Sequence, residues 1–176
     1  MEITLTISKE DVMKEVATTT AYTGAKMDTD ATAHDRISTV DEDESQLDRF
    51  WDECRSDLCQ ELIGMVTFEG ETTGRVIGGT ILPLATAATS EAAQAAIVTP
   101  HYELRLDVSK SFDSALLPSM KVSLFNYFVM GIAAKWYVYT NKQEAGDYAD
   151  KANTLLDDIH RKAVYKKKPT RPTYDD

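Results

Sequence analysis

The fold is decided by residues 120–139, MKVSLFNYFVMGIAAKWYVY, which are apolar on nearly every side of a helix. Such a helix is buried in a protein core, buried in an assembly, or inserted in a membrane. A membrane span needs about 20 largely apolar residues. Here Lys121, Asn126 and Lys135 interrupt the stretch, and a lysine near the centre of a span costs roughly 2.5–3.5 kcal/mol. We therefore expect the central helix of a soluble core and no contact with a membrane.

Three further helices are expected around this one, because apolar residues recur every three or four positions. The helix before it makes about five turns and ends before Gly70. Its apolar stripe is Leu47, Trp51, Cys54, Leu58, Leu62 and Met65. An N-terminal helix begins at Ser8, whose hydroxyl can cap it, and stops near Gly24. The apolar stripe of that helix is Val12, Val16 and Tyr22. The last helix covers about residues 144–163.

Two segments alternate between apolar and polar residues. Residues 102–108 do so strictly and are predicted to form a strand with one buried face, while residues 3–7 fit a short strand or an arm. Residues 71–100 are an insertion rich in Thr, Ala and Gly, which fits a loop, a short hairpin or, near 90–98, a short helix. The predicted fold is therefore mainly α, a bundle of about four helices with a small β element.

The chain is expected to form one domain, residues 1–163, followed by an extended arm, residues 164–176. Its 176 residues fit a single domain, and Pro169 and Pro172 end helix formation in the arm. A hydrophobic share of 43% is enough to build a core. We expect that core to contain Leu47, Trp51, Leu58, Leu62, Phe128, Ile132 and Trp136.

The formal net charge of −10 is unevenly distributed. Residues 1–75 hold 18 acidic and 7 basic side chains, whereas residues 76–176 hold 11 acidic and 12 basic ones. Residues 161–171 contain six basic residues and no acidic one. Net acidity argues against a basic nucleic-acid binder, and the asymmetry suits head-to-tail contacts between identical subunits. Two ordinary solvated faces would show the same asymmetry.

An acidic run, consisting of Asp41, Glu42, Asp43 and Glu44, lies immediately before the second helix. Negative charge at this position favours the N-terminal end of the helix dipole. A bound cation is a weaker interpretation, because the run lacks the spacing of a twelve-residue calcium loop. We expect no metal site there.

No pairing of a nucleophile with a base stands out in the sequence. His34, His101 and His160 lie far apart, and each is interpreted as a solvated or locally bonded histidine. Cys54 and Cys59 are about 140° apart around a helix, so they cannot form a disulfide within it. Two cysteines also exclude a disulfide-rich scaffold. We therefore expect a protein that is not an enzyme, with no catalytic residue and no cofactor.

The C-terminal third of the chain resembles a known family. Residues 130–145, MGIAAKWYVYTNKQEA, are similar to a stretch of tailed-phage head–tail connector (adaptor) proteins, in which a hydrophobic helix ends in Ala-x-x-Trp-Tyr and Asn-x-x-Glu-Ala follows. Residues 159–172, IHRKAVYKKKPTRP, resemble the tails of phage and prophage structural proteins from gut bacteria, crAss-like phages among them. The resemblance covers residues 118–172, and the insertion at 71–100 has no counterpart in the family core.

This resemblance implies a ring, typically of twelve subunits, that stacks under the portal at the phage neck, extends the DNA channel and docks the tail. The partners would be identical subunits, the portal and other neck or tail proteins, and DNA would pass through without specific binding. The protein would assemble in the host cytoplasm and reside in the virion. We expect the acidic run to face the channel. The expected interface residues at the arm are Arg161, Lys162, Lys166, Lys167, Lys168, Pro169, Arg171, Pro172, Thr173 and Tyr174.

Two other classes of function stay open. One is a tail-completion or tail-terminator protein, or another non-enzymatic helical adaptor. The other is a small enzyme with its site in residues 71–100, which is the weakest of the three hypotheses because no residue set there can do acid–base or nucleophilic work.

Overall fold

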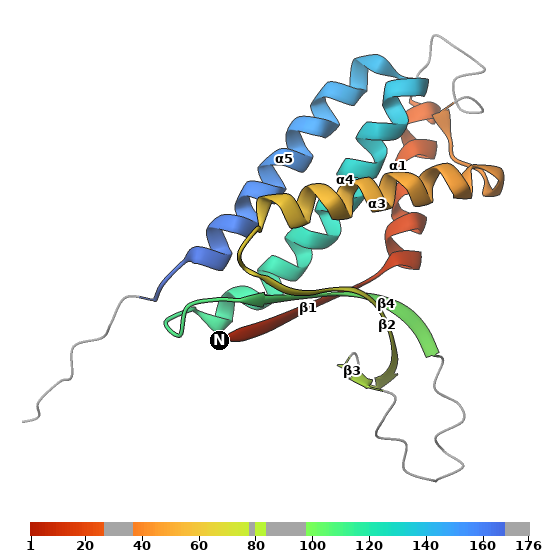
Figure 1. Cartoon of the computed structure of the whole chain (residues 1–176). Coiled ribbons are helices and arrows are strands. Elements are labelled where there is room, and N and C mark those ends of the chain that lie inside the picture. Colours follow the sequence, from red (N-terminus) through yellow and green to blue (C-terminus); the bar gives the residue numbers. More distant parts are fainter. Residues whose placement is uncertain (27–36, 78–79, 84–97, 168–176) are drawn as a thin grey trace, which may run out of the picture.

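The computed structural model describes residues 1–26, 37–77, 80–83 and 98–167. In this part of the chain, four α-helices cover one face of a four-stranded antiparallel sheet (Figure 1). The helices are α1 (Lys9–Ala25), α3 (Glu44–Glu61), α4 (Leu117–Thr140) and α5 (Lys142–Val164). The strands are β1 (Glu2–Ser8), β2 (Val66–Ile77), β3 (Thr80–Pro83) and β4 (Val98–Asp107). The mainly α fold with a small β element is confirmed.

The sheet has the strand order β1-β4-β2-β3, and each neighbouring pair is antiparallel. Because side chains alternate between the two faces of a strand, one row from β1 and β4 points at the helices and is buried. This row consists of Ile3, Leu5, Ile7, Tyr102, Leu104 and Leu106. Residues 3–7 therefore form a strand rather than a free arm, and the strand predicted at 102–108 begins earlier, at Val98, and ends at Asp107.

The insertion at residues 71–100 begins as a hairpin. Strands β2 and β3 pair with Val76 opposite Ile81, and β2 also pairs with β4 along most of its length. The hairpin interpretation is thus confirmed for the described residues. The short helix considered near 90–98 lies outside them, apart from Val98, which belongs to β4.

The second helix ends before the last residues of its predicted apolar stripe. Helix α3 stops at Glu61, and Gly64 takes a φ of 85°, a left-handed conformation that glycine adopts without strain. The carbonyl of Met65 then accepts a hydrogen bond from the amide of Asp107 (2.7 Å), and the chain enters β2. Met65 packs on the core from outside the helix. The predicted length of about five turns and the end before Gly70 are confirmed, whereas Leu62 and Met65, which were assigned to the stripe of the helix, lie beyond its last residue because the apolar spacing continues across this turn.

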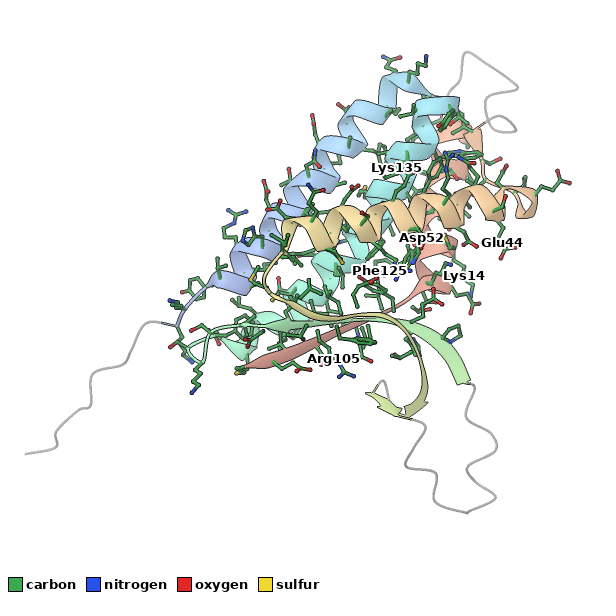
Figure 2. The ribbon with its side chains drawn as sticks, in the orientation of Figure 1. Lys14, Glu44, Asp52, Arg105, Phe125 and Lys135 are labelled. Atoms are coloured by element: carbon green, nitrogen blue, oxygen red, sulfur yellow. The ribbon has the colours of Figure 1, made fainter. Side chains whose placement is uncertain are left out.

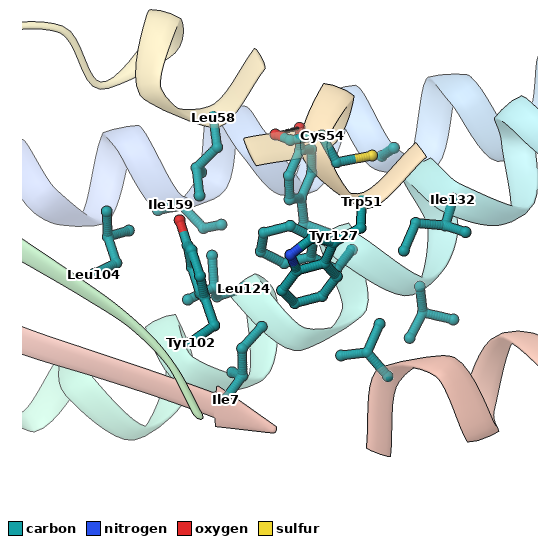
Figure 3. Close-up of a cluster of buried hydrophobic side chains, with 14 of the residues drawn as sticks. Ile7, Trp51, Cys54, Leu58, Tyr102, Leu104, Leu124, Tyr127, Ile132 and Ile159 are labelled. Carbon is teal, nitrogen blue, oxygen red and sulfur yellow. Dashed lines mark hydrogen bonds between the residues drawn. The ribbon is translucent and has the colours of Figure 1, made fainter. Parts of the chain in front are cut away.

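Helix α4 lies at the centre of the core, with α1, α3, α5 and strand β1 packed on it. Aromatic side chains from three elements meet beside it. The rings of Trp51 and Phe128 stack at 4.2 Å, and Tyr102 meets Phe128 edge-on at 5.3 Å (Figure 3). All the residues expected in the core are buried, namely Leu47, Trp51, Leu58, Leu62, Phe128, Ile132 and Trp136.

One residue assigned to an apolar stripe is exposed. Tyr22 on α1 is 62% exposed, and the buried positions after Val16 are Thr20 and Gly24. The buried stripe of α1 follows a four-residue step, which leaves Tyr22 on the solvent side. The cap of this helix is as predicted, since the Ser8 hydroxyl accepts a hydrogen bond from the Asp11 amide (3.2 Å).

Helices α3 and α4 approach each other closely at one glycine. A Cβ atom placed on Gly131 would lie 2.9 Å from the sulfur of Cys54, so only glycine fits without a shift. One turn away, the Tyr127 hydroxyl donates a hydrogen bond to the carbonyl oxygen of Cys54 (2.9 Å). This pair of contacts sets the spacing of the two helices.

One described segment, Ser114–Thr140, is long and apolar enough to cross a membrane, a test that the core helices of soluble proteins also pass. Most of this segment is helix α4, and polar groups fix it to its neighbours. Lys135 lies 3.3 Å from carboxylate oxygens of both Glu53 and Asp57 on α3. The packing is that of a core helix.

Candidate assembly surfaces

The acidic run forms the start of helix α3. Residues 41–43 make a short 3-10 helix, and α3 follows from Glu44. The Asp43 carboxylate accepts a hydrogen bond from the Val40 amide (3.0 Å), which ties the entering chain to the helix end. The interpretation of this run as a helix start is confirmed. No group of three or more potential metal ligands occurs among the described residues.

Two carboxylates of the acidic run project into solvent. Glu42 and Glu44 are exposed, and the described part of the chain supplies neither with an ion-pair partner. Exposed carboxylates at a helix start can attract a cation or a basic segment. This end of the molecule is therefore a negatively charged surface.

A groove of about 510 Å³ lies beside these carboxylates, between α1 and the start of α3. Its apolar lining comes from Met13, Ala17, Val40, Leu47 and Pro100. The charged side chains along it are largely paired, since Lys9 binds Asp48 (3.0 Å) and Lys14 binds Glu10 (2.6 Å). Val40 lines this α1–α3 groove and is 54% exposed, so apolar surface is open to a partner.

The basic residues expected at the arm divide into two groups. Lys162 belongs to the body of the protein: it pairs with Asp158 and donates hydrogen bonds to the hydroxyls of Ser119 (2.7 Å) and Ser123 (3.0 Å) on α4. Partial burial alone would raise the pKa of Asp158, but the hydrogen bonds from Lys162 and Ser123 outweigh it and lower that pKa. Within the chain, the Lys162 ammonium joins α5 to α4, and the expected contact of Lys162 with a neighbouring subunit stays a prediction.

The start of the arm is also fixed to the body. Helix α5 ends at Val164, and Tyr165 turns into extended backbone. The Lys167 amide then donates a hydrogen bond to the Ser111 carbonyl (2.8 Å), and Lys166 forms a β-bridge with Phe112. The side chains of Arg161, Lys166 and Lys167 remain exposed. The other expected arm residues lie outside the described part of the chain, and they are Lys168, Pro169, Arg171, Pro172, Thr173 and Tyr174.

The acidic and basic surfaces lie at opposite ends of the molecule. Helix α3 starts at Glu44 and ends beside the last turns of α5, where Glu61 lies 2.9 Å from a ring nitrogen of His160. Figure 2 shows Lys14 and Glu44 at the right, with the end of α5 at the left. Eighteen residues of α3 separate the two surfaces, a length of about 27 Å at 1.5 Å per residue.

The histidines and cysteines hold structural positions where they are described. His160 bonds to Glu61, His101 is buried on β4, and His34 lies outside the described residues. Cys54 and Cys59 are both free thiols. Burial raises the pKa of the Cys54 thiol to about 12, so this thiol stays protonated and unreactive near neutral pH.

Long-range ion pairs and the groove itself are features that the sequence did not predict. Arg55 on α3 pairs with Glu69 on β2. The alternation along β2 gave no usable signal, because it groups Phe68 with Val66, whereas a register irregularity between these two residues exposes Phe68 and places Glu69 opposite Leu104. No local sequence pattern predicts the groove, because its lining residues come from α1, from α3 and the residues before it, and from β4.

No protein-family model, curated protein or solved structure matches this chain. Function is therefore inferred from the two charged ends, the groove and the resemblance carried by residues 118–172.

Proposed function

We propose that this chain is a structural protein of the phage neck, where identical copies form a ring between portal and tail. The ring extends the DNA channel and gives the tail a surface on which to dock. The observation that carries the proposal is the placement of an acidic surface and a basic end at opposite ends of one rigid helical body. Residues 130–145 and 159–172 add the resemblance to head–tail connector proteins.

A molecule with two different complementary ends associates head to tail, and such contacts close into a ring when the rotation between neighbours allows it. Opposite charges at the two ends favour this order over head-to-head contact, in which like charges would face each other. The ring is typically of twelve subunits in the family that the chain resembles. The portal and other neck or tail proteins are its proposed partners.

The acidic run also suits a channel for DNA. Glu42 and Glu44 are exposed, and carboxylates repel the phosphate backbone, so DNA slides past without binding. In this proposal at least part of the acidic run faces the lumen. The protein acts without catalysis, and its location is the virion.

Imaging of purified phage particles by electron cryomicroscopy tests the proposal. The expected result is a ring of this protein directly below the portal, with carboxylates lining its lumen. A ring at the far side of the neck or at the tail end would favour the tail-terminator alternative instead. Absence of the protein from particles would refute a virion role, and a lumen lined by Lys and Arg would refute the acidic channel.

A further inference from the structure

We infer that the C-terminal segment of one copy, residues 168–176, binds in the α1–α3 groove of the next copy. The inference deepens the proposed function and rests on it in one respect, namely that copies of the chain meet head to tail. It assigns a ligand to the groove: a proline-containing peptide of this same chain that has two basic residues in its first half. The evidence comes from charge, from reach and from the lining of the groove.

The charges of the two surfaces are complementary over part of the segment. Residues 168–176, KPTRPTYDD, carry two basic side chains in their first half, Lys168 and Arg171, and two acidic ones at the end, Asp175 and Asp176. The receiving surface carries Glu42 and Glu44, exposed and unpaired within the described part of the chain. Lys9 and Lys14, which also line the groove, are already neutralised by Asp48 and Glu10. The complementarity is therefore local, between the basic first half of the segment and the exposed carboxylates at the start of α3.

The length of the segment excludes binding in its own groove. The segment follows Lys167, whose amide is hydrogen-bonded to Ser111 three residues after the end of α5. Figure 2 shows the end of α5 on the opposite side of the molecule from Glu44. Nine residues extend at most about 30 Å, whereas α3 alone holds the two ends about 27 Å apart. A segment stretched over that distance has no residues left to lie along the groove. In a head-to-tail pair, the groove of the second copy lies next to Lys167 of the first, so the segment does not have to span the length of α3.

The apolar lining matches the anchors of the segment. Val40 and Pro100 are exposed at the groove, and Met13 is half-buried within it. The apolar groups that such a lining can bury are supplied by Pro169, Pro172 and Tyr174. Proline also pre-sets an extended backbone, which lowers the entropy lost when the segment orders.

Site-directed crosslinking of the full-length protein tests the inference. One preparation carries Tyr174→Cys and a second carries Val40→Cys, both in a Cys59→Ser background, and the two are mixed with a short bismaleimide. We expect at least tenfold more crosslinked heterodimer than with Val122→Cys. Val122 is the matched control because it is a valine of similar exposure, 59% against 54%, on α4 rather than at the groove. Equal yields at the two valines, or no crosslink, would overturn the inference.

A second arm of the experiment separates the trans contact from a contact within one chain. Both cysteines are placed in the same chain and diluted with excess wild-type protein. Crosslinking between copies falls as wild type is added, whereas an intramolecular crosslink does not change. A yield that survives dilution, in a product of monomer mass, would contradict the reach argument.

Charge exchange then tests the pairing itself. Glu42→Lys with Glu44→Lys in the Val40→Cys protein is expected to reduce the crosslink about tenfold. Mixing it with a partner that carries Lys168→Glu and Arg171→Glu restores the yield if the two clusters face each other. Glu15→Lys is the control, since Glu15 is an exposed carboxylate of α1 that does not line the groove. No restoration by the exchanged pair would overturn the assigned contact.

The two proposals fail in different ways. Absence of the protein from phage particles would refute the neck function and leave the crosslink between purified copies unchanged. Conversely, a neck ring that forms with residues 168–176 removed would refute the arm contact and leave the neck function standing.

Discussion

The contact between α3 and α4 and the groove between α1 and α3 share one helix but are built in opposite ways. Where α3 meets α4, the side chains are buried, and a glycine permits an approach so close that a single added carbon would touch Cys54. At the groove between α1 and α3, apolar side chains are exposed to solvent, and the carboxylates of Glu42 and Glu44 have no ion-pair partner among the described residues. One side of α3 stabilises the fold, and the other leaves apolar and acidic side chains exposed.

This difference teaches how stability and association are divided in the molecule. Burial of apolar area contributes most of the free energy of folding, so changes in the α3–α4 contact should lower stability. Exposed charges contribute little to folding, and in the proposed ring they set the order and specificity of contacts between copies. We therefore expect substitutions in the core to cost the most stability and removal of the arm to cost the least.

Truncation of Trp136 should cause the largest loss. Trp136 is 9% exposed on α4, and its indole N–H donates a hydrogen bond to the Ile37 carbonyl (2.7 Å). Trp136→Ala should lower the free energy of unfolding by about 3–5 kcal/mol, because it leaves a cavity and an unpaired carbonyl. Urea denaturation followed by circular dichroism measures this loss. A loss within the error of the wild-type value would mean that α4 is not the centre of the core.

Addition of one methyl group at the α3–α4 contact should cost less. Gly131→Ala places a Cβ atom 2.9 Å from the Cys54 sulfur, which is buried and has to move within a packed core. We expect a loss of about 1–3 kcal/mol from overpacking. Gly146→Ala on α5 is the control, because nothing lies within 4 Å of its added Cβ atom, and it should leave the protein as stable or more so. Equal effects at the two glycines would contradict the close approach.

The α3–α4 contact was predictable from the sequence because it depends on a local period. Apolar residues at steps of three and four placed Trp51, Cys54 and Leu58 on one face, and the structure buries all three. The end of the same helix was not predictable, since the turn at Gly64 interrupts a period that the residues beyond it happen to continue. The prediction of Tyr22 as buried failed because the buried residues of α1 continue at steps of four after Val16, at Thr20 and Gly24, which are not large apolar residues.

The groove was not predictable because its parts are distant in sequence. The acidic run and the basic end are visible as charge patterns, yet only the fold shows that one borders a groove and that the other begins about one helix length away. Likewise, the basic residues at 161–171 look alike in sequence. The structure separates Lys162, which joins two helices, from Arg161 and Lys166, which are exposed.

The contact made by Lys162 should contribute modestly and depend on pH. Lys162→Met removes the ion pair with Asp158 and two hydrogen bonds to α4, a loss of about 1–2 kcal/mol near neutral pH. Because the folded state lowers the pKa of Asp158, this contribution is complete above the ordinary pKa of an aspartate and disappears as the pH falls through the lowered value. The difference between wild type and variant should therefore shrink in acid.

Denaturation curves of Lys162→Met at several pH values, compared with those of the control variant Lys121→Met, measure this dependence. Lys121 is an exposed lysine of α4 for which the described residues supply no ion pair, so its removal should change stability little at any pH. A Lys162→Met deficit that stays constant from neutral to strongly acidic pH would show that the pair with Asp158 does not carry the effect.

Truncation of the arm should have the smallest effect on stability and the largest on assembly. A stop after Lys167 retains the hydrogen bond from its amide to Ser111 and the bridge of Lys166 to Phe112, so the free energy of unfolding should not change. A stop after Ala163 removes both, and should cost about 1 kcal/mol. Both truncations should abolish association between copies, measured by sedimentation, because both remove Lys168, Arg171 and the prolines. If only the longer truncation blocked association, the segment 164–167 would hold the interface, and the groove would need another ligand.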